Sequence, residues 1–137
     1  MNIKVRYALA GIAGVLIAGT IVFSIEAIGH IVYPVPESVD LNDIEQVKAM
    51  IAGLPVGAFM FVLAAYFIAT YVGSWVACMI ARSSPRIFAG IVGALMLAGT
   101  AMNLITIPHP LWFSIVALTG IPVMAFLASI TMKQAAA

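Results

Sequence analysis

Four long apolar runs constrain this chain more than any other feature. They cover residues of about 5–32, 54–80, 87–107 and 111–132, most of the 137 residues. A helix of about 20 predominantly apolar residues can cross the hydrocarbon of a bilayer. Only 8% of the residues are charged, whereas soluble domains carry about 25%. We therefore predict a single all-α membrane domain, residues 1–137, with four transmembrane helices in an up-down bundle.

The only sizeable loop lies between the first two runs, at residues 33–52. Pro34 and Pro36 end the first helix, because proline lacks a backbone donor and fixes φ. The acidic stretch 40–43 is typical of a helix start. Apolar residues then recur at helical spacing: Ile44, Val47 and Ile51. This pattern predicts a short amphipathic helix on the membrane surface.

Small residues recur every four positions in the last part of the second run: Ala65, Ala69, Gly73, Ala77 and Ala81. Such a seam lets another helix approach closely. Gly19 shares a helix face with Glu26 in the first run, so we expect that face to point toward other helices. The seams predict close packing within the bundle, between protomers, or both. A homo-oligomer or a membrane-protein partner is therefore expected, in addition to the lipid bilayer.

The basic residues set the predicted orientation. In a four-span arrangement, five of the six lie on one side: Lys4, Arg6, Arg82, Arg86 and Lys133. Only Lys48 lies on the other side, with four of the acidic residues. Lysine and arginine near short loops mark the cytoplasmic side, so both chain ends are predicted to be cytoplasmic. A net charge of +1 without a basic tract gives nucleic-acid binding no electrostatic basis.

Polar residues gather at the outer end of the predicted bundle. Glu26 is the only acidic residue within a span, and His30 and Tyr33 follow on the same helix face. Glu26 lies about 27 Å along the first span, near the outer edge of a hydrocarbon layer about 30 Å thick. Asn103 falls in the outer half of the third span, and His109 lies in the hairpin that follows it.

This cluster has two interpretations. A carboxylate and two imidazoles suit zinc, iron or manganese, which makes Glu26, His30 and His109 candidate metal ligands. A proton-linked role would use the same groups. Alternatively, the cluster is structural: Glu26 bonds to His30 or to another helix, and the outer face docks a partner.

An enzyme is the least expected class, because no nucleophile with an adjacent base is present. The absence of charge at the bilayer midplane argues against a conducting path. We therefore expect a non-catalytic accessory or homo-oligomeric membrane protein, with cation or proton binding or transport as the alternative. No cofactor beyond a divalent metal is indicated.

Three short motifs carry a resemblance: Glu26-Ala-Ile-Gly-His30, Tyr33-Pro-Val-Pro36 and Ile107-Pro-His-Pro-Leu-Trp112. In these motifs and in its four-span layout, the chain resembles small bacterial inner-membrane proteins that have no assigned activity. The resemblance implies a bacterial cytoplasmic membrane. It transfers no functional residues.

Overall fold

The computed structural model describes residues 2–135, with side chains through residue 132, and contains five α-helices. They are α1 (Ile3–Val32), α2 (Ile44–Ala52), α3 (Val56–Ala81), α4 (Pro85–Thr106) and α5 (Leu111–Ala135). By length and composition, α1, α3, α4 and residues Leu111–Met132 of α5 could each cross a membrane. The four predicted spans are therefore confirmed as long apolar helices, with boundaries close to those expected.

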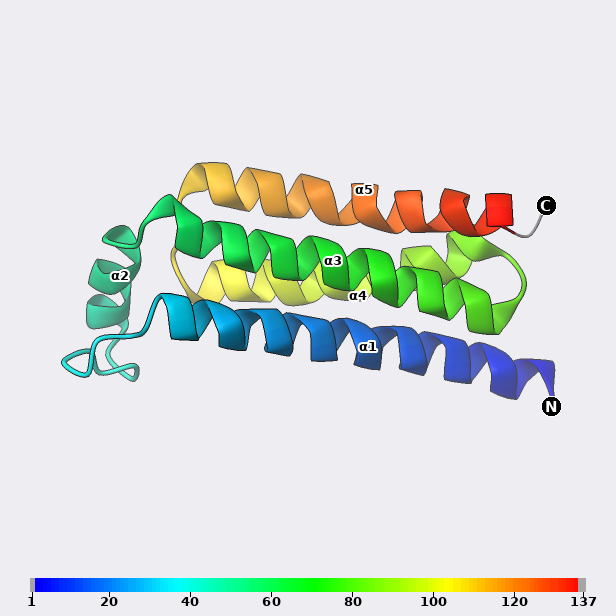
Figure 1. The fold of residues 1–137 in the computed structure, drawn as a ribbon, viewed down its shortest axis with the longest axis horizontal. Helices are drawn as coiled ribbons and strands as arrows, with labels where there is room; N and C mark the ends of the chain where they lie inside the picture. Colours follow the sequence, from blue (N-terminus) through cyan, green and yellow to red (C-terminus); the bar gives the residue numbers. More distant parts are fainter. Residues whose placement is uncertain (1, 136–137) are drawn as a thin grey trace.

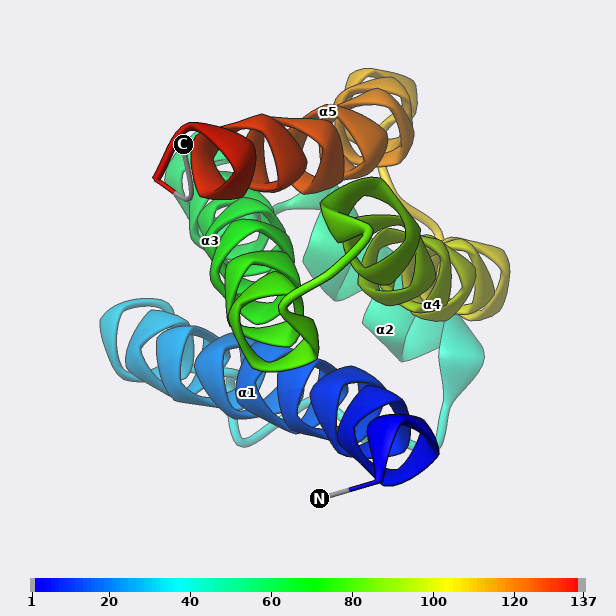
Figure 2. The same cartoon turned by 90° about the vertical axis from the view of Figure 1, so that its right-hand side faces the viewer.

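The central element of the packing is α3, which contacts α1, α4 and α5, while α4 also packs against α5 (Figure 2). Figure 1 shows the four long helices side by side, with successive helices running in opposite directions. The start of α1 and the end of α5 therefore lie at the same end of the molecule. The short α2 lies across the opposite end.

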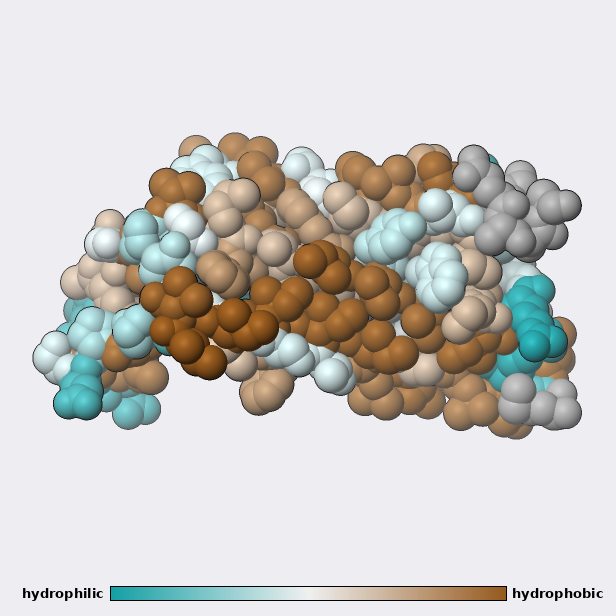
Figure 3. Space-filling view, in the orientation of Figure 1, coloured by the Kyte–Doolittle hydropathy of each residue, from teal (hydrophilic) through white to brown (hydrophobic). Residues whose placement is uncertain are grey.

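On the face shown in Figure 3, the most hydrophilic residues lie at the two ends, and most of the surface between them is apolar. We call one end the basic end, defined by Lys4, Arg6, Arg82 and Arg86. The other is the acidic end, where α2 and the loop before it carry Glu37, Asp40, Asp43 and Glu45 together with Lys48. The side chain of Lys133, predicted to join the basic group, lies outside the described side chains.

The predicted seam of small residues on α3 is buried. Its alanines are all 0% exposed, and its glycine is buried as well: Ala65, Ala69, Gly73, Ala77 and Ala81. The buried residues of α1 are also small: Ala10, Gly14 and Ala18. A Cβ atom on Gly14 would lie 2.7 Å from the carbonyl oxygen of Gly73 and 2.8 Å from the Ala77 methyl. The seam is used within the chain, so it gives no support to contacts between protomers.

The prediction that Gly19 faces the bundle is wrong. It is exposed, and a Cβ atom added there would meet nothing within 4 Å. The buried positions of α1 are instead four residues apart, at Ala10, Gly14 and Ala18. A row of every fourth residue drifts slowly around a helix. Continued in steps of four from Ala18, this row includes Glu26, which is half-buried, and leaves out Gly19, which is exposed.

The predicted short helix is present as α2. Asp43 caps it, since its carboxylate accepts a hydrogen bond of 3.0 Å from the backbone N–H of Glu45. Ile51 is buried, and Val47 packs against the same apolar cluster as Ile51. Ile44 is exposed. These contacts hold α2 across the acidic end of the molecule.

Candidate functional site

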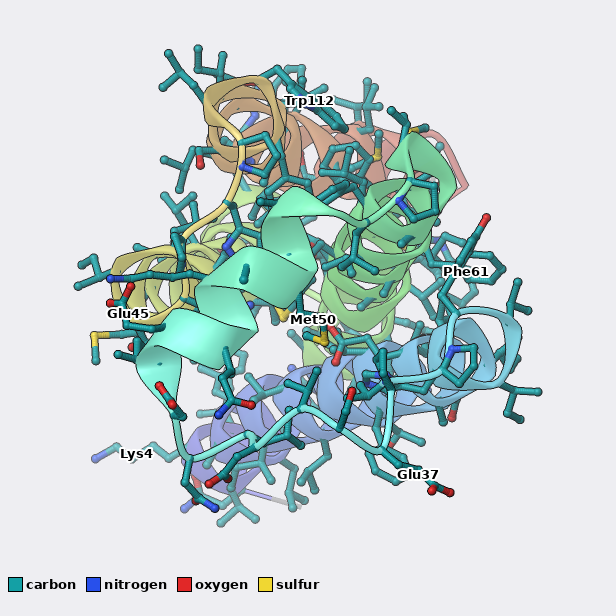
Figure 4. All side chains as sticks on the ribbon, turned by 90° about the vertical axis from the view of Figure 1, so that its left-hand side faces the viewer. Lys4, Glu37, Glu45, Met50, Phe61 and Trp112 are labelled. Carbon is teal, nitrogen blue, oxygen red and sulfur yellow. The ribbon has the colours of Figure 1, made fainter. Side chains whose placement is uncertain are left out.

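A cavity of about 280 Å³ lies at the acidic end, with residues of α2 in its wall. The five polar residues predicted to cluster all line it: Glu26, His30, Tyr33, Asn103 and His109. They come from α1 and the residue that follows it, from α4, and from the turn before α5. Much of the remaining wall is apolar: Met50, Ile51, Leu54, Phe59, Phe61 and Val62. Figure 4 shows Met50 between α2 and the long helices.

Charge in the cavity wall comes from one carboxylate. Among the described residues, Glu26 is the only acidic one in the wall, and no lysine or arginine lines it. Lys48, the basic residue at this end, is paired with Glu45 at 2.8 Å. Glu37 is exposed and points away from the bundle (Figure 4). The carboxylates gathered at this end make it attractive to cations.

Asn103 is oriented by a tyrosine of α3. Its Nδ2 donates a hydrogen bond of 2.7 Å to the hydroxyl of Tyr66, which is 6% exposed. Because the amide nitrogen has this partner, Asn103 Oδ1 is left as the acceptor of the side chain. Tyr66 was not among the residues predicted from the sequence. The signal was a tyrosine inside an apolar run, since a buried hydroxyl needs a hydrogen-bond partner.

The ring of His109 is fixed by two aromatic neighbours and one carbonyl. It stacks on Phe113, with centroids 4.8 Å apart and an interplanar angle of 15°, and meets Phe59 edge-on at 6.4 Å. Its Nδ1 lies 2.7 Å from the carbonyl oxygen of Ile107. A carbonyl only accepts, so Nδ1 carries a hydrogen, and Nε2 of the neutral ring is an acceptor.

Tyr33 connects the end of α1 to the start of α3. Its backbone N–H donates to the carbonyl of Gly29 at 2.7 Å, and its ring meets Phe61 edge-on at 6.0 Å. The hydroxyl occupies the space that a Cβ atom on Gly57 would need. Glycine at position 57 therefore allows the tyrosine to close this side of the cavity.

The candidate metal ligands line the cavity without forming a recognisable metal centre. Among the described residues, no group of three histidine, cysteine, aspartate or glutamate side chains is placed to hold an ion. The salt bridge within the described part of the chain joins Lys48 to Glu45 and does not involve Glu26 or His30. The metal hypothesis thus stays a prediction to which this geometry adds nothing.

Comparisons with protein families, with curated proteins and with solved structures find no match for this chain.

Proposed function

We propose that this chain is an integral membrane protein in which α1, α3, α4 and α5 form an up-down bundle across the bilayer. Large apolar side chains cover its surface: Phe23, Ile105 and Leu111 are 75%, 81% and 77% exposed. Such a surface is unfavourable in water and suits lipid. The basic end would be cytoplasmic and the acidic end would face outward. We propose the cytoplasmic membrane of a bacterium as its location.

Within that membrane, the protein acts as a non-catalytic binding protein for a small organic cation. The observation that carries this proposal is the composition of the cavity wall. Glu26 supplies a negative charge, and Asn103 Oδ1 and His109 Nε2 supply further acceptors. Phe59 and Phe61 offer aromatic surface in the same wall. Acceptors beside aromatic rings suit a ligand with a cationic N–H group and an apolar body.

The core outside the cavity is largely apolar, which favours a binding protein over a channel. Toward the basic end, the buried cluster consists of small and apolar residues: Ala10, Ala77, Cys78, Ala81, Phe88, Ala89 and Val92. The buried hydroxyls of Thr70 and Ser74 donate to backbone carbonyls of Tyr66 and Ala89. A conducting path needs polar groups along its length. The polar groups that a ligand could contact lie in the cavity wall and not in the core toward the basic end.

An accessory or homo-oligomeric role remains a prediction beside this one. The seam that motivated it is buried within the chain, so the role now depends on a partner that the cavity or the outer face would recognise. Co-purification with a stoichiometric partner would support it. A monodisperse single chain in mild detergent would count against it.

The test of the binding proposal is isothermal titration of tag-free protein in mild detergent with three probes of one shape. Benzylammonium is a cation, benzyl alcohol is neutral and benzoate is an anion. We expect benzylammonium to bind at least about tenfold more tightly than the other two, because it alone can pair with Glu26. Glu26→Gln should remove that preference.

Glu37→Gln is the matched control, since it removes the same charge at the same end from an exposed position outside the cavity wall. It should leave the preference intact. Equal binding of the three probes, or an unchanged preference in Glu26→Gln, would overturn the proposal. Tight binding of Zn²⁺ alone, lost in both Glu26→Ala and His109→Ala, would favour the metal alternative instead.

A further inference from the structure

Two arginines from different helices line one surface hollow at the basic end. Arg6 comes from the start of α1, and Arg82 ends α3 in a left-handed conformation with φ of 55°. Met79 and Ile80 form the rest of the hollow. The close packing of α1 on α3 brings these two arginines to one hollow despite their distance in sequence.

The side chain of Arg6, which lines this hollow, has a hydrogen-bond donor without an acceptor among the described residues. Its Nε is buried and has no hydrogen-bond partner among the described residues. The adjacent Tyr7 offers its ring face, 5.9 Å from the guanidinium carbon. The Tyr7 hydroxyl is already paired with Ser83 at 2.7 Å. A buried donor of a charged group without an acceptor is costly, so an anion bound beside Arg6 would lower the cost of holding its charge in this hollow.

The chain supplies no acidic side chain to this end. All five acidic residues lie between positions 26 and 45, in the last part of α1, the loop after it and α2, which are remote from the basic end (Figure 1). The nearby charges are instead of the same sign as Arg6, on Lys4, Arg82 and Arg86. An external anion would relieve this repulsion.

We propose that Arg6 and Arg82 hold the phosphate of an anionic phospholipid in the leaflet at the basic end. Guanidinium groups match phosphate oxygens with paired N–H donors. Basic pockets at the cytoplasmic ends of membrane helices recognise such headgroups. The exposed Met79 and the neighbouring Ile80 give the glycerol and acyl parts an apolar surface. This inference rests on membrane insertion, as proposed above, but not on the ligand of the outer cavity.

The experiment is native mass spectrometry of the full chain released from mild detergent, with phosphatidylglycerol or phosphatidylcholine added. We expect one phosphatidylglycerol to be retained at least about tenfold more tightly than phosphatidylcholine, whose phosphate is offset by its own cation. Arg6→Gln and Arg82→Gln should each remove most of this preference. Retention of both lipids with equal affinity would overturn the proposal.

Arg86→Gln is the matched control, because it removes the same charge at the same end and lies outside this hollow. It should retain the lipid preference, whereas equal losses in all three variants would show a diffuse charge effect and overturn the site. Displacement of the lipid by millimolar inorganic phosphate would assign the site to a free anion instead of a lipid.

Two readouts keep the outcomes distinct. Helicity measured by circular dichroism checks each variant, and the exposed Arg82 carries the test if Arg6→Gln fails to fold. Partition of the wild-type chain into the aqueous phase without detergent would refute membrane insertion itself. Membrane insertion with no lipid preference would refute the lipid site alone.

Discussion

Gly14 and Gly73 place their backbones in direct contact across the α1–α3 interface. A Cβ atom on Gly14 would lie 2.7 Å from the carbonyl oxygen of Gly73, and one on Gly73 would lie 2.6 Å from that of Gly14. Backbone atoms cannot move aside as a flexible side chain can. We therefore expect Gly14→Ala to lower the free energy of unfolding by about 1–3 kcal/mol through overpacking, measured by reversible denaturation in mixed micelles.

Gly11→Ala is the control for this prediction. It lies on the same helix, and a Cβ atom there meets nothing within 4 Å. Glycine is less favourable than alanine in a helix interior. Gly11→Ala should therefore be neutral or stabilise the fold by up to about 1 kcal/mol. Similar losses in the two variants would mean that the interface is not as tight as described.

Tyr66 is expected to orient Asn103 in the cavity wall. Tyr66→Phe removes the acceptor of the 2.7 Å hydrogen bond from Asn103 Nδ2 and leaves a partly buried donor. The stability loss should be about 0.5–1.5 kcal/mol, and affinity for benzylammonium should fall because the amide oxygen loses its fixed position. Denaturation in mixed micelles and titration with the cation measure the two effects.

Tyr71→Phe makes the same change on the same helix. Its hydroxyl pairs with Thr131 at 3.1 Å in an exposed position, remote from the cavity wall. Cation affinity should not change in this variant. A loss of affinity as large as that of Tyr66→Phe would show that the effect is not local.

Much of this fold follows from the sequence, because apolar run length and small-residue spacing are strong local signals. The seam from Ala65 to Ala81 is buried as predicted, since alternatives would leave five small residues on the surface with little contact. The face of α1 was harder to predict. Gly19 and Glu26 are seven residues apart and nearly in line, but the contact row of α1 advances by four residues and drifts away from Gly19.

The site was predicted in part. The five polar residues were grouped by helix face and by depth, and all line one cavity. Helix face and depth do not give the distances between side chains on different helices. The sequence therefore could not show that the described residues form no group of three metal ligands. The partner of Asn103 was also out of reach, because pairing Asn103 with Tyr66 requires the lateral packing of α3 against α4.

The stability of the first turn of α2 should depend on pH, because Asp43 caps this helix. The side chain of Gln46 and then the backbone N–H of Glu45 donate to its carboxylate, each at 3.0 Å, and hold the pKa of Asp43 below its ordinary value. A lowered pKa stabilises the folded form above the ordinary value of about 4. That stabilisation is lost as the pH falls through the lowered pKa.

We therefore expect the Cα chemical shifts of residues 44–52, measured by NMR in micelles, to lose helical character at low pH. Asp43→Asn keeps a capping side chain without a titrating group, so its shifts should change less over the same range. The shifts of α3 serve as an internal reference. An identical pH profile in the wild type and in Asp43→Asn would remove the cap as the cause.

The orientation in the membrane can be tested with two matched cysteine variants. Ser38 lies in the loop before α2 and Ser84 in the turn between α3 and α4, and both are exposed. Neither substitution changes a charge, so the basic residues that set the orientation stay in place. Cys78 is buried, and a Cys78→Ala background leaves the introduced thiol as the only one.

In intact cells, a membrane-impermeant maleimide should label Ser38→Cys and should label Ser84→Cys only after the membrane is permeabilised. The physical reason is the charge difference between the two ends, because lysine and arginine near short loops are retained on the cytoplasmic side. The reverse pattern would invert the bundle, which would place the cation cavity inside the cell and the arginine pair in the outer leaflet. Labelling of both variants from one side would contradict the four-span arrangement. That arrangement places one crossing, α3, between positions 38 and 84, so the two positions must lie on opposite sides.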